Sequence, residues 1–204
     1  MIIDLHTHTV YTPGCLIAPE DLIEQALEVG LDGICVLEYL SLKASQVTED
    51  FTYGTPLKVF RGIEAHTDQG HLLIYGLTEL QWQLFEGLEN IPAQHLIDCV
   101  RNWGGVCIPA HPFRFQSASI GEKVESLVGI FAIEGYNGRA DIAENQEAQQ
   151  YGQRLNLRLT GGSDAYVVGQ VGRCVTIFER DIETSNELVA ELKAGRFEAR
   201  YLFL

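Results

Sequence analysis

Short runs of apolar and β-branched residues recur along the whole chain, and each run is long enough for one strand. They cover Ile2 to Leu5, Gly33 to Leu37, Leu57 to Ile63, His71 to Leu77, Val106 to Ala110, Gly129 to Glu134, Leu155 to Thr160 and Cys174 to Phe178. Apolar runs of this length are typical of buried strands. The pattern therefore predicts a sheet built from these segments.

Helical patterns lie between several of the apolar runs. The clearest covers Pro19 to Val29, because proline suits the first turn of a helix and Gly30 suits its exit. Three further helices are predicted over Ala93 to Trp103, Asp141 to Arg154, and Thr184 to Gly195, the last of which begins with a capping box. The polar stretch from Ser41 to Pro56 is compatible with a short helix plus a loop.

Strands that alternate with helices, at roughly 25 to 30 residues per unit, predict parallel pairing through right-handed crossovers. Either an open doubly wound sheet or a barrel satisfies this order of elements. The 204 residues contain no internal repeat, low-complexity tract or Pro/Ser-rich linker. We therefore predict an α/β fold in a single domain that covers residues 1–204.

The charge balance narrows the partners of this domain. Fourteen basic against 28 acidic residues give a net charge of −14, and the basic residues form no cluster. Affinity for a nucleic-acid backbone rests largely on Lys and Arg, so we expect no strong nucleic-acid surface. The chain is 46% hydrophobic, which is enough to build a core and is unlike the composition of disordered proteins.

Cysteine use and the amino-terminal sequence indicate a cytoplasmic protein. The five cysteines are an odd number without a CxxC pair, so we interpret them as reduced and mostly structural. The first residues, MIIDLHTHT, do not resemble a secretory signal, and no apolar run is long enough to span a membrane. We expect no membrane partner, and the sequence does not indicate an oligomeric state.

Histidines at the end of the first predicted strand are the first candidates for chemistry. Alternate residues of a strand share one face, so Asp4, His6 and His8 are expected to point the same way. Two neutral imidazoles with a carboxylate behind them can bind a metal ion, the carboxylate fixing the tautomer of a ring. The alternative is an ordinary pair of strand histidines with polar partners.

Four more candidates lie at or beside the ends of predicted strands. They are Glu64, His71, His111 and Asp164. Each one taken alone is more often structural, but the carboxyl ends of parallel strands converge on one edge, where sites are built. Their joint placement therefore predicts a single site.

An ordered set of motifs resembles the PHP (polymerase and histidinol phosphatase) superfamily over nearly the whole chain. The segments are DLHTHTVYT (4–12), GLDGICVLEY (30–39), GIEAH (62–66), GHLLIYGL (70–77), AHPFR (110–114), IEGYNG (133–138) and GGSDAY (161–166). The resemblance implies an irregular seven-stranded (β/α)7 TIM-like barrel that binds two or three metal ions, usually zinc, manganese or iron. It also implies a hydrolase, because many members are phosphoesterases.

The family pattern, transferred residue by residue, implies two divalent metal ions in this chain. His6, His8, Glu64 and Asp164 would hold one ion, and Glu64 would bridge to a second ion held by His71 and His111. The positions that hold a third ion in the family read Gly14, Tyr39 and Tyr166, so we predict that this third site is lost. A thiolate from the adjacent Cys15, or tyrosine ligation of ferric iron, is the alternative.

The resemblance and the predicted metal pair favour hydrolysis of a small phosphorylated substrate. We expect Glu64, Asp164 and Arg114 to be catalytic, with Arg114 facing the phosphate and Arg139 and Arg173 as weaker candidates. Three other functions stay open. They are a catalytically silent metal-binding PHP module, an amidohydrolase-like C–N hydrolase, and a barrel that binds a partner without metal.

Overall fold

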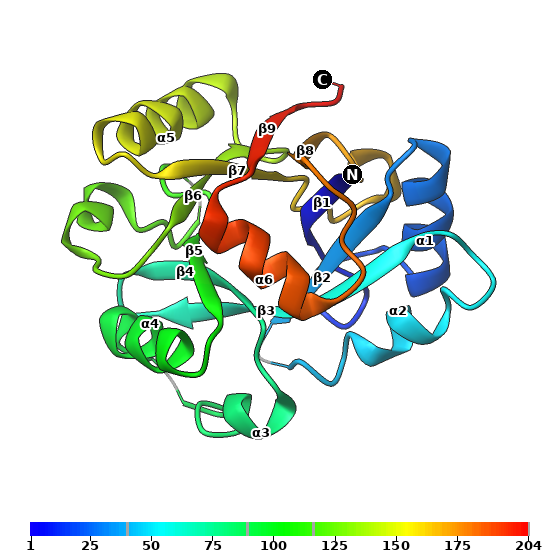
Figure 1. Cartoon of the computed structure of the whole chain (residues 1–204), viewed down its shortest axis with the longest axis horizontal. Helices are drawn as coiled ribbons and strands as arrows, with labels where there is room; N and C mark the ends of the chain where they lie inside the picture. The colour runs from blue at the N-terminus through cyan, green and yellow to red at the C-terminus, as the bar shows by residue number, and fades with distance from the viewer. Residues whose placement is uncertain (40, 89, 116, 204) are drawn as a thin grey trace.

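The computed structural model describes residues 1–39, 41–88, 90–115 and 117–203. Its main element is a curled seven-stranded sheet in the order β5-β4-β3-β2-β1-β8-β9 (Figure 1). The strands are β1 (Ile2–Thr7), β2 (Gly33–Tyr39), β3 (Lys58–Thr67), β4 (Gly70–Tyr75), β5 (Val106–Pro109), β8 (Cys174–Phe178) and β9 (Phe197–Tyr201). The strands β6 (Ala132–Asn137) and β7 (Arg158–Gly162) pair in a second, two-stranded sheet.

The strand directions correct the predicted (β/α)7 TIM-like barrel. Within the sheets, β1–β2, β2–β3 and β6–β7 pair in parallel, whereas β3–β4, β4–β5, β1–β8 and β8–β9 are antiparallel. Only two residues separate β3 from β4, which suits a hairpin and is too short for a helical crossover. The result is a mixed α/β half-barrel in which β6 and β7 lie between β5 and β1, and a closed barrel is not shown.

Six α-helices and two short 3₁₀ helices of the described residues surround the sheets (Figure 1). They are α1 (Pro19–Glu28), α2 (Gln46–Asp50), α3 (Glu79–Trp82), α4 (Ala93–Asn102), α5 (Ile142–Arg154), α6 (Ser185–Ala194), η1 (Gly121–Ser126) and η2 (Val168–Gln170). The four long helices confirm the predicted ones within a residue or two, and α2 is the short helix expected between residues 41 and 56. The helix α3 and the strand β9 were not predicted.

A close approach of two strands brings the later candidate residues to the first strand. An added Cβ on Gly162, at the end of β7, would lie 2.3 Å from Cβ of His6 in β1. Only glycine permits this contact, because any side chain would overlap the histidine. Gly162 therefore lets the chain that carries Asp164 reach the metal-capable end of β1.

The apolar core fills the space between the curled sheet and the helices. Tyr75 and Phe60 are among its largest buried side chains, and the Tyr75 hydroxyl donates a hydrogen bond of 2.8 Å to the carbonyl of Leu5. All five cysteines are free thiols, and four of them are buried. In the described part of the chain, none of the helices has the length and apolar character needed to cross a membrane.

Candidate metal centre

The end of β1 and the residues just after it carry two histidines whose rings meet. His6 and His8 are fully buried, and their Nε2 atoms lie 3.1 Å apart. Asp4 is buried on the same strand, but its carboxylate accepts hydrogen bonds from the backbone N–H groups of His6, Ser163 and Gly172. Its expected role behind an imidazole ring is therefore wrong, and Asp4 instead ties β1 to the segments that follow β7 and η2.

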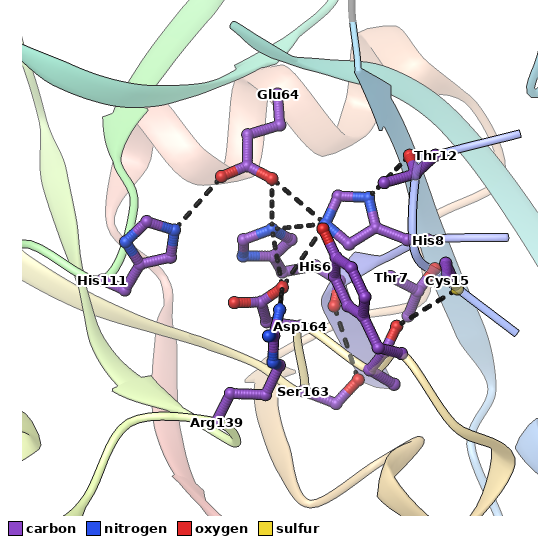
Figure 2. Close-up of polar contacts among 12 residues, drawn as sticks. His6, Thr7, His8, Thr12, Cys15, Glu64, His111, Arg139, Ser163 and Asp164 are labelled. Carbon is purple, nitrogen blue, oxygen red and sulfur yellow. Dashed lines mark hydrogen bonds and ion pairs between the residues drawn. The ribbon is translucent and has the colours of Figure 1, made fainter. Parts of the chain in front are cut away.

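Two carboxylates complete a first set around these histidines (Figure 2). One Glu64 oxygen, Oε2, lies 3.2 Å from Nε2 of His6 and 3.1 Å from Nε2 of His8. Asp164 Oδ1 lies 3.8 and 3.4 Å from the same two nitrogens. These donor atoms lie within 4.8 Å of one another, which is close enough for one cation to contact all four residues.

The other oxygen of Glu64 faces a second set. Glu64 Oε1 lies 2.7 Å from Nδ1 of His71 and 3.1 Å from Nε2 of His111 (Figure 2 shows the contact to His111). His71 comes from the β3–β4 hairpin and His111 from the end of β5, so three neighbouring strands supply this set. The structure therefore brings all six sequence-predicted ligands together, in two sets that share one carboxylate.

The charges of the two sets depend on one another. Burial alone would raise the pKa of Glu64, but His6 and its other imidazole partners hold this pKa well below the usual value. Burial would lower the pKa of His6, yet Glu134, Asp164 and Glu64 raise it well above the ordinary range. Protons on imidazoles thus balance the buried carboxylates, and these are the protons that a metal cation would displace.

Three of the four imidazoles have a partner on the ring nitrogen that faces away from the cluster. His6 Nδ1 lies 2.9 Å from Glu134 Oε1, and His111 Nδ1 lies 3.3 Å from the hydroxyl of Ser117. His8 Nδ1 lies 3.3 Å from the hydroxyl of Thr12. Such partners leave each Nε2 free to accept a metal, so the donor set fits a divalent cation.

The partners of the histidines include residues that the sequence did not identify. Thr12 donates its own hydroxyl to Glu38, a fully buried carboxylate that also accepts from Thr9. Glu38 therefore supports His8 through Thr12. Glu134 lies inside the quoted motif IEGYNG, but no spacing rule assigned it to His6.

Two arginines lie against Asp164 (Figure 2 shows Arg139). Arg114 forms an ion pair with Asp164 Oδ2, and Arg139 Nη1 lies 3.4 Å from Oδ1. Together with Phe115, Asp141 and Glu144, these arginines line a cavity of about 500 Å³. Burial would raise the pKa of Asp164, but His6, His8 and Arg114 lower it. Arg173, the other candidate cation, lines a different, mainly apolar cavity.

Two tyrosine rings also pack against His8. The Tyr39 and Tyr166 rings pack edge-on against His8, with centroids 5.1 and 5.3 Å away, and their hydroxyls are 3.0 Å apart. Gly14 lies beside them, since an added Cβ there would be 3.8 Å from the Tyr166 ring. Cys15 joins neither metal-capable set among the described residues: it is buried, its thiol faces the carbonyl of Ala165, and burial raises its pKa to about 11.

The two remaining histidines lie outside both sets. His66 stacks on the ring of His71 at a centroid distance of 4.1 Å and contacts Tyr39 edge-on. It therefore supports the second set from outside. His95 is exposed on α4.

Comparison with known proteins supports the sequence resemblance. The family model "PHP-associated" matches residues 143–197. The uncharacterised protein MJ0417 of Methanocaldococcus jannaschii is 24% identical over 198 residues, which cover 92% of this chain and 75% of that protein. Of the six candidate ligands, Asp164 lies inside the segment that the family model matches.

Two solved structures share the fold. One is a two-domain protein from Bacteroides vulgatus ATCC 8482 that contains a predicted PHP-like metal-dependent phosphoesterase; it has a TM-score of 0.78 at 18% identity, covering 98% of this chain and 64% of that one. The other is endonuclease Q in complex with a 27-mer duplex that carries an abasic lesion; it has a TM-score of 0.68 at 18% identity, covering 97% of this chain and 58% of that one. At these identities the likeness shows a common fold.

Proposed function

We propose that this chain, which resembles the PHP superfamily and buries six metal-capable side chains at one point, is a metal-dependent phosphoesterase. The observation that carries the proposal is the position of Glu64, whose two carboxylate oxygens face two different sets of imidazoles. A carboxylate in this position bridges a pair of cations. We therefore assign two divalent ions to the site.

The ligands divide between the two ions as the contacts do. His6, His8, Glu64 and Asp164 hold the first ion, and Glu64, His71 and His111 hold the second. When bound, such a pair supplies a water molecule with a lowered pKa and polarises the phosphoryl oxygens of the substrate. Mixed imidazole and carboxylate ligands suit zinc, manganese or iron.

The tyrosine pair limits the site to two ions. Each phenol hydroxyl is engaged by the other, and burial raises the pKa of both tyrosines, so neither offers an anionic oxygen near neutral pH. The buried, protonated thiol of Cys15 provides no substitute ligand. The hydroxyls of Tyr39 and Tyr166 instead border the space beside His8, where a bound substrate can receive a hydrogen bond.

Arg114 and Arg139 bind the phosphate in this proposal. Both guanidinium groups contact Asp164, and both line a cavity next to it. A planar guanidinium presents paired N–H donors to phosphate oxygens, and its charge favours the anion over the negative protein surface. A cavity of about 500 Å³ suits a small phosphorylated molecule.

Metal content combined with an activity panel tests the proposal. Protein loaded with Mn²⁺ or Zn²⁺ should contain two ions per chain and release phosphate from small monoesters. A chelator should abolish the activity, and added metal should restore it. His71→Ala should lose activity, whereas His95→Ala, which changes an exposed histidine outside both sets, should retain it.

The same panel separates the other functions. Two bound ions with no turnover of any ester would indicate a silent metal-binding module, and turnover of amides alone would indicate a C–N hydrolase. Cleavage of an abasic duplex alone would replace the small-molecule substrate with DNA. The proposal would be overturned if the protein bound no metal and its melting temperature did not change on addition of a chelator. This result would favour a metal-independent binding protein.

A further inference from the structure

One buried carboxylate outside the ligand set touches both halves of the proposed metal centre. Glu134, on β6, is 1% exposed. Its Oε1 lies 2.9 Å from Nδ1 of His6, a ligand of the first set. Its Oε2 accepts a hydrogen bond of 2.7 Å from the backbone N–H of His111, a ligand of the second set. Glu64 also contacts both sets, but its contacts are to ring nitrogens, whereas Glu134 contacts one ring nitrogen and one backbone N–H.

A third contact extends Glu134 to the remaining carboxylate. Asn137 Nδ2 donates to Glu134 Oε2 at 3.0 Å and to Asp164 Oδ2 at 3.3 Å. The position of Asn137 is itself fixed, because its Oδ1 accepts from the backbone N–H groups of Arg139 and Ala140. Glu134 thus has contacts that lead to His6, His111 and Asp164.

The backbone of His111 shows why the contact to its N–H matters. His111 has a positive φ of 29°, a conformation that non-glycine residues rarely adopt and that persists only when surrounding contacts hold it. The residue after it is Pro112, which has no N–H to donate. The hydrogen bond to Glu134 therefore restrains the His111 backbone from its N–H side, while the His111 carbonyl accepts from the Ser119 hydroxyl and the Arg114 N–H.

We infer that Glu134 is a positioning residue that selects the metal-binding tautomer of His6 and, with its second oxygen, holds His111 in place. The inference rests on the proposed metal-dependent function. As a carboxylate, Glu134 only accepts hydrogen bonds, so it requires a proton on Nδ1 of His6. The Nε2 lone pair of His6 is then directed at His8, Glu64 and the first cation.

The two oxygens of Glu134 predict an unequal effect of Glu134→Gln. A glutamine has one acceptor oxygen and one NH₂ group. The oxygen should stay on the side of Oε2, where two donors, the His111 N–H and the Asn137 amide, would otherwise face the NH₂. The NH₂ then faces Nδ1 of His6 and makes it an acceptor, so that Nε2 carries the proton and cannot ligate. The first ion should be lost and the second retained.

Zinc content measures this difference directly. Wild-type protein equilibrated with Zn²⁺ and desalted should hold two ions per chain. Glu134→Gln should hold one, because its affinity for the first ion should fall by about 10- to 100-fold. Adding His71→Ala to Glu134→Gln should remove the remaining zinc, because His71 belongs to the second set. The matched control is Glu191→Gln, which changes another glutamate of 1% exposure that pairs with Arg180 and Arg196 away from the cluster, and it should hold two ions.

A second measurement needs no variant. Nitrogen-15 spectra of the zinc-loaded wild type should show a proton on Nδ1 of His6 and none on Nε2. A proton on Nε2 would overturn the inference even if Glu134→Gln did not fold.

The remaining outcomes are also decisive. Two zinc ions in Glu134→Gln would refute the selection of the tautomer, and loss of both ions would show a general structural role in its place. A wild type that binds no zinc would instead overturn the proposed function, so the two failures are distinguishable.

Discussion

His8 contacts two groups of side chains whose chemistry is opposite. On one side its Nε2 faces Glu64 and Asp164, at 3.1 and 3.4 Å. On the other side its ring contacts Tyr39 and Tyr166, and the Tyr166 hydroxyl donates a hydrogen bond to the Tyr39 hydroxyl. Both regions are built at the same ends of β1, β2 and the segment after β7, so the backbone alone does not distinguish them.

The side chains make the difference between these regions. Carboxylates and imidazoles leave donor atoms directed at a common point, and their pKa shifts keep Glu64 and Asp164 ionised. The phenols satisfy one another, and burial raises the pKa of each. We therefore expect a cation on the carboxylate side, where it would replace protons held among these side chains. The comparison predicts that substitutions on the two sides have very different effects.

The largest effect is expected for Glu64→Gln. The amide has one oxygen, so it cannot serve both sets of imidazoles, and it removes a buried negative charge that faces four histidines. We expect loss of at least one bound ion and a decrease of about 10⁴-fold in kcat/KM for a phosphate monoester. Metal analysis and phosphate release measure both. Glu191→Gln is the control, and full activity of Glu64→Gln would remove the bridging role.

Substitution of the arginines should have the next largest effect, and Arg114 should matter more than Arg139. Arg114 has a side-chain exposure of 12%, whereas that of Arg139 is 33%. Arg114 also donates a hydrogen bond of 3.3 Å to Asn137 Oδ1, and Asn137 in turn contacts Glu134 and Asp164. We expect Arg114→Ala to lower kcat/KM by about 10²-fold and Arg139→Ala by about tenfold.

Steady-state kinetics with one phosphate monoester compares the arginine variants. Arg101→Ala, which changes an exposed arginine of α4, should match the wild type. Equal losses for Arg114→Ala and Arg139→Ala would show that burial against Asp164 does not determine the contribution of an arginine.

The sequence predicted the strands and long helices well because their signals are local. Apolar runs, proline at the start of α1 and the capping box of α6 depend on neighbours along the chain. Strand direction has no such signal, since a continuous apolar run reads the same in a parallel and an antiparallel sheet. The sequence therefore predicted parallel barrel strands where the structure has the antiparallel β3–β4 hairpin. The strand β9 alternates Phe197, Ala199 and Tyr201 with charged residues, a period of two that would have indicated it.

The candidate site divides in the same way. All six residues of the two metal-capable sets were predicted, because their types and order match a known pattern and they lie at or near strand ends. Glu134 was missed because its contacts join it to His6 and His111, which are 128 and 23 residues away. Asp4 was misplaced because strand alternation shows which face a side chain shares but not which atom it meets there.

A smaller effect is expected on the tyrosine side of His8. Tyr39→Phe and Tyr166→Phe each remove one hydroxyl from a single hydrogen bond, so metal content should stay at two ions and kcat/KM should fall by less than about tenfold. A phenol whose pKa is raised on folding keeps its proton when the unfolded chain loses it, so the free energy of unfolding should fall as pH rises above about 10. The Phe variants should lose part of this dependence.

Denaturant unfolding between neutral and alkaline pH, on chelated protein, measures this dependence. The matched control is Tyr53→Phe, because Tyr53 is 97% exposed. A loss of bound metal in Tyr39→Phe or Tyr166→Phe would show that a phenol is a ligand, and the contrast between the two sides of His8 would fail.

The smallest effect is expected for Cys15→Ser, which tests the last possible ligand on the tyrosine side. The thiol is buried, faces the Ala165 carbonyl at 3.8 Å, and has a pKa raised to about 11, so near neutral pH it carries a proton. A serine hydroxyl can donate to the same carbonyl, and the free energy of unfolding should change by about 1 kcal/mol or less. Two ions should remain bound, and the activity should be unchanged. Three ions in the wild type and two in Cys15→Ser would instead show a thiolate ligand, and the tyrosine side would then be a metal site in its own right.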